Sequence, residues 1–222
     1  MLLSRAVLSL ACVGLLAGCS SGGSSPQEST ETADIGKVTS LKSSFGPEFK
    51  VEDFPPKGID PKELAAQTLP PNITFDPPDC EKFAAGSLPD DLKGNMAAVS
   101  AEGAGNRFVA IALETSKPLP ITDPGPDCQK VSFAGGPLHG TVEVIPAPEV
   151  EGVHTRAVHR VLQTTINGKP QTGEVFSYTA DFGDYRVIVT ANPLVETGKP
   201  PVPVDTKRAE ELLTSAVTAV RS

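Results

Sequence analysis

The chain has 222 residues, of which 22 are proline and none is tryptophan, and its formal net charge is -8. This composition argues against nucleic-acid binding, because an acidic surface repels phosphate backbones and few aromatic rings are available to stack on bases. It also argues against attachment to anionic lipid through a basic patch. The length leaves room for one domain of about 170 residues once an N-terminal export segment is set aside.

Residues 1–18 have the pattern of a bacterial lipoprotein signal peptide. A positive charge near the start precedes the apolar residues 6–15, and Leu16-Ala17-Gly18 then places small residues directly before Cys19. The pattern predicts that cleavage makes Cys19 the new N-terminus and that its thiol carries a diacylglycerol. An ordinary secretory signal cleaved near Ala17 is the alternative. The apolar segment is too short to span a bilayer.

Residues 19–35 are predicted to form a lipidated, flexible tether. The segment after Cys19 is rich in serine, glycine and threonine and has too few apolar side chains to build a core. Residues 36–222 are predicted to fold as a single extracytoplasmic domain. The lipid on Cys19 is expected to hold that domain at the outer face of the cell membrane, since each buried methylene contributes about 0.8 kcal/mol to anchoring.

The first half of the domain is predicted to contain short, mixed elements. Residues 45–54 alternate loosely in hydropathy and predict a strand. Residues 60–67 begin with the Asp-Pro pair that is typical of a helix start, and they predict a short helix. Residues 79–85 predict a further helical turn, which Gly86 ends.

From Asn95 onward the hydropathy pattern is that of strands. Residues 107–114 enclose a continuous apolar run, which is typical of a central strand covered on both faces. Asn167-Gly168 and Gly183-Asp184 are turn signals between neighbouring strands. The region is therefore predicted to be an antiparallel meander. Its further candidate strands are residues 141–145, 154–165, 174–181 and 185–191.

The last predicted element is a helix capped by Asp205 or Thr206. A single wide apolar stripe predicts that this helix packs on one face of a sheet. The elements together predict an α+β fold, with an antiparallel sheet of about five to seven strands and the C-terminal helix on one face. The stripe consists of Ala209, Leu212, Leu213, Ala216, Val217 and Val220.

The cysteines predict one disulfide in this fold. Cys12 lies in the signal peptide and Cys19 is the acylation site, which leaves Cys80 and Cys128 as an even pair in an exported domain. Both follow a proline-rich loop and an aspartate. A redox or metal role is the alternative, although the chain contains no Cys-x-x-Cys motif.

The domain contains five short motifs: Pro78-Asp79-Cys80, residues 94–99, Val158-His159-Arg160, residues 181–185 and residues 189–193. These motifs resemble those of mycobacterial LppR-like lipoproteins, which carry a domain of unknown function. The resemblance covers about residues 36–222. It implies an α+β fold with one disulfide, loosely similar to the extracytoplasmic sensor domains of actinobacterial receptor kinases. No catalytic or ligand-binding residue carries over from it.

No catalytic motif emerges from the nucleophilic and titratable residues. His154 and His159 are five positions apart in a predicted strand, so they face opposite sides of the sheet and do not share a metal ion. His139 is predicted to lie in a loop, and no Gly-x-Ser-x-Gly turn presents a serine nucleophile. We therefore expect no enzyme activity, no catalytic residue, no cofactor and no metal site.

The sequence favours a membrane-anchored envelope lipoprotein that acts as a non-enzymatic binding or sensor-like module. Its expected partners are the membrane, through the lipid anchor, and either an envelope protein or a small-molecule or lipid ligand. Nucleic acid is not an expected partner. Two alternatives stay open. One is a cell-wall hydrolase or transferase whose active site matches no motif, and the other is a structural envelope-association protein.

Overall fold

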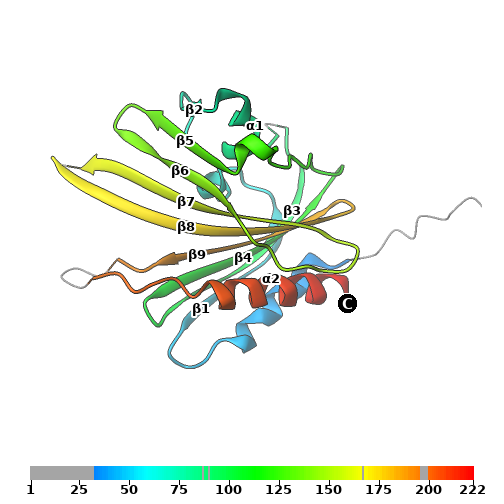
Figure 1. Cartoon of the computed structure of the whole chain (residues 1–222). Helices are drawn as coiled ribbons and strands as arrows, with labels where there is room; N and C mark the ends of the chain where they lie inside the picture. The colour runs from blue at the N-terminus through cyan, green and yellow to red at the C-terminus, as the bar shows by residue number, and fades with distance from the viewer. Residues whose placement is uncertain (1–32, 87, 90, 167, 196–199) are drawn as a thin grey trace, which may run out of the picture. The chain divides into compact units, whose positions relative to one another are not determined.

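The computed structural model describes residues 33–86, 88–89, 91–166, 168–195 and 200–222. The expected signal peptide, Cys19 and the expected tether up to residue 32 lie outside these ranges. The described residues fold around one antiparallel sheet of nine strands in the order β1-β3-β4-β9-β8-β7-β6-β5-β2 (Figure 1). The strands are β1 (Lys50–Gly58), β2 (Thr74–Asp76), β3 (Gly94–Gly103), β4 (Asn106–Thr115), β5 (Lys130–Gly135), β6 (Leu138–Ile145), β7 (His154–Ile166), β8 (Lys169–Phe182) and β9 (Tyr185–Pro193).

The α+β class and the antiparallel sheet are confirmed, but the expected five to seven strands are too few. The sequence did not reveal β2 or β5, which pair with each other through Thr74–Asp76 and Ser132–Ala134 at one edge of the sheet. Strand β2 has three residues, which are too few to establish an alternation. Strand β5 has six residues with alternating burial, and this signal was overlooked. Strand β1 was also misplaced. It begins at Lys50 and continues through Pro55-Pro56, which is tolerated because β1 is the other edge strand.

Strands β7 and β8 form a long hairpin whose register runs from His154–Asp181 to Ile166–Lys169. The chain therefore reverses where the Asn167-Gly168 signal predicted a turn, although Asn167 itself lies outside the described residues. The second signal, Gly183-Asp184, joins β8 to β9, and Phe182 pairs with Tyr185 across it. Gly183 has φ +53°, a left-handed value that glycine adopts without steric cost.

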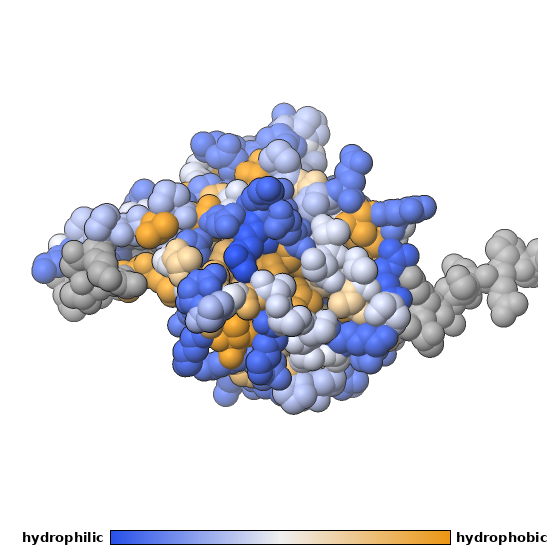
Figure 2. Space-filling model, turned by 90° about the horizontal axis from the view of Figure 1, so that it is seen from below, coloured by the Kyte–Doolittle hydropathy of each residue, from blue (hydrophilic) through white to orange (hydrophobic). Residues whose placement is uncertain are grey.

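One face of the sheet, here called the helix face, is covered by the helices η1 (Ile35–Ser44) and α2 (Thr206–Arg221). The C-terminal helix is confirmed, and the carboxylate of Asp205 caps it by accepting a hydrogen bond from the Arg208 amide at 3.0 Å. Seen from this side, polar residues cover most of the surface (Figure 2). All six side chains of the predicted stripe are buried.

Helix η1 was not predicted. It is a 3₁₀ helix, and Ile35, Val38 and Leu41 recur at the three-residue spacing that places their side chains on one buried side. The Asp34 carboxylate accepts a hydrogen bond from the Gly36 amide, and the Asp34 amide donates to the Val220 carbonyl at 2.8 Å. This contact joins the two ends of the described chain. Among the described residues, no helix is both long and apolar enough to cross a membrane.

The opposite face of the sheet, here called the loop face, is covered by the segment between β1 and β3. Leu64 packs against apolar side chains of β3, β4 and β9, while Leu69 and Ala84 pack against β5 and β6. The expected helix at residues 60–67 is only a turn followed by η2 (Ala65–Gln67). The helical turn expected at residues 79–85 is present as η3 (Pro78–Cys80) and α1 (Glu81–Ala84).

Candidate functional site

A cavity of about 80 Å³ lies on the loop face, between strands β6 to β9 and the segment that contains α1. We call it the arginine pocket. Its walls also include residues of the segment between β4 and β5. The polar residues that line it from the sheet are Arg156, Arg160, Ser177, Thr179 and Arg186, and those from the covering segments are Gln67, Lys82 and Thr122.

The arginine pocket is basic although the chain is acidic. Its lining includes four cationic side chains, and none of the described residues that line it is aspartate or glutamate. The chain as a whole has a formal net charge of -8. Positive charge concentrated in a recess attracts anions and raises their local concentration.

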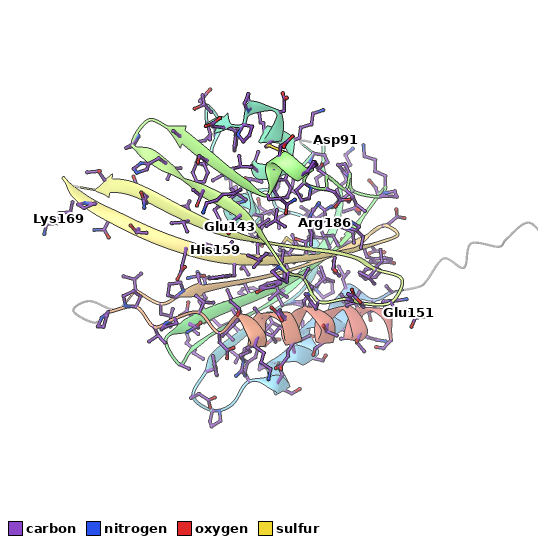
Figure 3. The ribbon with its side chains drawn as sticks, viewed as in Figure 1. Asp91, Glu143, Glu151, His159, Lys169 and Arg186 are labelled. Carbon is purple, nitrogen blue, oxygen red and sulfur yellow. A yellow bond between two sulfur atoms is a disulfide. The ribbon has the colours of Figure 1, made fainter. Side chains whose placement is uncertain are left out.

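Arg186 is held by protein partners. It lies over the central strands, whereas Lys169 marks the far tip of the β7–β8 hairpin (Figure 3). Its Nε donates to Asp181 Oδ1 at 2.5 Å, and its Nη2 donates to the Pro120 carbonyl at 3.2 Å. Both side chains of the ion pair are buried. Arg186 therefore fixes the segment around Pro120 against the sheet.

Arg156 is only partly satisfied. Its Nη1 donates to the Thr122 carbonyl at 3.4 Å, and its Nη2 lies 3.9 Å from Asp181 Oδ2. That carboxylate oxygen is itself buried without a hydrogen-bond partner. Burial lowers the pKa of Arg156, and repulsion from Arg186 lowers it further. Asp181 thus supplies one negative charge to two guanidinium groups.

Arg160 has no protein partner among the described residues. Its exposed fraction is 9%, and its Nε is buried without a hydrogen bond. Burial lowers the pKa of Arg160, and no carboxylate in the described ranges raises it. Arginine stays protonated in proteins. A buried guanidinium without a counter-charge is costly, because buried charges are normally paired.

The wall opposite Arg160 is built to leave it room. Gly86 ends the α1 segment with φ +67°, and a Cβ atom at this position would lie 3.3 Å from an Arg160 Nη atom and 2.7 Å from the Gln67 carbonyl. Any side chain here would therefore displace the backbone or the guanidinium. The disulfide between Cys80 and Cys128 ties this wall to the start of β5.

Of the residues singled out from the sequence, Cys80 and Cys128 form the predicted disulfide, with their Cα atoms 5.5 Å apart. The disulfide supports the wall of the arginine pocket and does not line it. The expected acylation site, Cys19, lies outside the described residues.

The histidines are not brought together. His154 Nε2 lies 2.9 Å from Asp123, and His159 Nε2 lies 2.9 Å from Glu174. The expectation that His139 lies in a loop is wrong, since it pairs with Ala134 and Gln163 inside the sheet. Within the described ranges, no group of three or more metal-ligating side chains is arranged to hold a metal ion.

Sequence reasoning missed the three arginines of the pocket. Arg186 could have been recognised, because it is a charged residue in the otherwise apolar start of β9. A charged side chain in a buried strand is rare unless it is paired, so it indicates a buried partner or a site. Arg156 and Arg160 are four residues apart in β7 and therefore face the same side of the sheet. Their convergence with Arg186 depends on how β7, β8 and β9 pair.

The fold and site define a disulfide-bonded α+β domain with one antiparallel sheet and a basic recess on its loop face. The chain belongs to the family described as domain of unknown function DUF5642, whose model matches residues 34–221. No curated protein matches the sequence.

Two solved structures are similar. The X-ray structure of an uncharacterised Mycobacterium smegmatis protein, described as an Rv0999 ortholog, is 53% identical with a TM-score of 0.80, and the match covers 86% of this chain and 98% of that one. The extracellular domain of PknH from Mycobacterium tuberculosis is 9% identical with a TM-score of 0.38, and the match covers 85% of this chain and 93% of that one.

Proposed function

We propose that this chain is a membrane-anchored, LppR-like envelope lipoprotein that acts as a non-enzymatic binding module, with the arginine pocket as its ligand site. The lipid on Cys19 holds the domain at the extracytoplasmic face of the membrane. The domain then presents the pocket to ligands outside the cytosol.

The compartment is supported by two independent features of the chain. The Leu16-Ala17-Gly18-Cys19 sequence follows a short apolar segment, as lipoprotein processing requires. The Cys80–Cys128 disulfide fits an oxidising compartment, because cytosolic thiols are kept reduced.

The binding role is supported by one observation above all, the buried guanidinium of Arg160, which has no partner in the part of the chain that the structure describes. A group of this kind lowers stability unless something compensates its charge. Costly arrangements of this sort persist at sites of function. A bound anion supplies the missing partner. A hydrolase would be favoured by a His139 side chain beside a serine or a carboxylate, and among the described residues the His139 side chain makes no hydrogen bond or ion pair.

Mass spectrometry of the full chain, purified in nonionic detergent from the membranes of an actinobacterial host, tests both halves of the proposal. Under denaturing conditions we expect a mass that lacks residues 1–18 and carries acyl groups on Cys19. Under native conditions we expect a further, non-covalent mass on the wild-type protein that Arg160→Met abolishes. Arg107→Met is the matched control, because Arg107 is an exposed arginine paired with Glu102 outside the pocket.

Two results would contradict the proposal. An unmodified Cys19 thiol in the membrane-derived protein overturns the anchoring. A wild-type protein whose native mass equals its denatured mass, as for Arg160→Met, carries no bound species; this result overturns the binding role and favours the structural envelope-association alternative.

A further inference from the structure

The excess positive charge in the arginine pocket favours a ligand with more than one negative charge. Asp181 pairs with Arg186 and lies 3.9 Å from Arg156, so its single negative charge serves the pair of guanidiniums at one end of the pocket. Arg160 adds a third guanidinium for which the described residues supply no counter-charge, and the exposed Lys82 adds a fourth cation. A carboxylate ligand would bring one negative charge to this excess. A phosphate monoester brings about 1.5 to 2 at neutral pH.

The neutral donors in the pocket also favour a tetrahedral oxyanion. Thr179 pairs in the sheet with Arg156 on one side and Ile188 on the other, and Ser177 precedes it on the same face of β8. Both residues line the pocket. They place hydroxyl groups between the arginines of β7 and Arg186 of β9. Phosphoryl oxygens accept hydrogen bonds from several donors at once, and arginine binds them in a bidentate manner.

The size of the pocket limits what enters it. Its volume of about 80 Å³ admits a group the size of a few water molecules. A phosphoryl group fits this description, whereas a sugar ring or an acyl chain must stay outside. Lys82 is exposed and lines the pocket from α1, where it adds to the attraction of an approaching anion.

We infer that the arginine pocket binds a phosphoryl group, with Arg160 as its principal ligand and with Arg156, Ser177 and Thr179 as further donors. The inference rests on the proposed function and names the ligand class of that same site. The phosphoryl group belongs either to a lipid headgroup or to a free phosphate or soluble phosphate ester, since the two present the same chemistry to the pocket.

Isothermal titration of inorganic phosphate into the full chain, in nonionic detergent with chloride as the only other anion, tests the inference. We expect one saturable site. Arg160→Met should weaken the binding by at least about tenfold, as expected for the loss of a charge-assisted bidentate contact, and Arg160→Lys by less. Thr179→Val, which replaces the hydroxyl by a methyl of similar size, should weaken it by about threefold or more. Arg107→Met should bind as the wild type does.

Two further titrations distinguish the sources of the phosphoryl group. Dioctanoyl phosphatidic acid binding at least about tenfold more tightly than inorganic phosphate assigns the site to a lipid headgroup, because the added affinity then comes from the glycerol and acyl chains. Equal affinities assign it to a free phosphate or a soluble ester.

The inference is overturned by a saturable acetate site that is tighter than the phosphate site, or by phosphate binding that Arg160→Met and Thr179→Val both leave intact. The phosphoryl inference is also overturned if native mass spectrometry shows an Arg160-dependent bound species but the titration shows no phosphate binding. In that case the proposed binding function remains supported. Phosphate binding by a membrane-derived protein whose Cys19 carries no lipid separates the two proposals in the opposite way. It supports the site and contradicts the anchored lipoprotein.

Discussion

Replacing Cys80 and Cys128 together by alanine is expected to lower the free energy of unfolding by about 4 kcal/mol. The disulfide links residues 48 positions apart, and a crosslink over a loop of this length removes a large share of the conformational entropy of the unfolded chain. Domains of this size are stable by only about 5 to 15 kcal/mol, so the variant should retain a fraction of its stability. Urea unfolding followed by circular dichroism measures the difference.

Reduction provides the control for this double substitution. Dithiothreitol should destabilise the wild type by a similar amount and leave the alanine variant unchanged, because the variant has no disulfide to reduce. The phosphate affinity of the variant should fall as well, since the disulfide ties the α1 wall of the arginine pocket to the sheet. Equal unfolding midpoints for the wild type and the variant would show that the crosslink does not constrain the unfolded chain.

Substituting Asp181 by asparagine is the second change with a large expected effect, a loss of about 3 to 5 kcal/mol. Asp181 and Arg186 are both buried and form a 2.5 Å ion pair, and Arg156 depends on the same carboxylate. Removing the negative charge leaves the buried guanidinium of Arg186 and the partly buried guanidinium of Arg156 without compensation. Chemical unfolding at neutral pH gives the size of the loss.

Two further variants serve as controls for Asp181→Asn: one removes both charges of the buried pair, and the other disrupts an exposed ion pair. Asp181→Leu combined with Arg186→Met should recover most of the stability, because removing both charges also removes the cost of burying one alone. Glu143→Gln disrupts the exposed pair between Glu143 and Lys130 and should cost less than about 1 kcal/mol. If Asp181→Asn lowers the free energy of unfolding by no more than Glu143→Gln does, the buried ion pair is not energetically coupled and the prediction is wrong.

The sequence predicted those parts of the fold whose signals are local. The apolar run at residues 107–114 became the central strand β4, and the 3.6-residue stripe became helix α2 with the expected cap at Asp205. The disulfide was predictable because only two cysteines remain once Cys12, in the predicted signal peptide, and Cys19, the predicted acylation site, are set aside. Each of these features can be recognised without knowing which strands pair.

Other elements depend on contacts between distant segments. Strand β2 has only three residues and exists because Phe75 lies opposite Phe133, which comes from β5. Helix η1 follows a three-residue spacing, which is shorter than the helical period used to recognise α2. Neither element has a local pattern that distinguishes it from loop.

The arginine pocket could not be predicted for the same reason. Arg160 is separated in sequence from Arg186 and from Gly86, and only the pairing of β7 to β9 and the folding of the α1 segment over them bring these residues to one cavity. The sequence predicted a strand at residues 154–165, which contains Arg156 and Arg160. It did not show which of those charges lack a partner, because that property belongs to the packed structure.

If the proposed function is correct, the fold keeps Arg160 for a ligand and not for stability. The free energies of unfolding of Arg160→Met and of the wild type, measured by urea titration of the full chain with chloride as the only anion, test this directly. We expect the variant to be at least as stable as the wild type, because methionine fills the space of the arginine stem without a buried, unpaired charge. A loss of more than about 1 kcal/mol would contradict the claim, because it would show that Arg160 stabilises the empty fold.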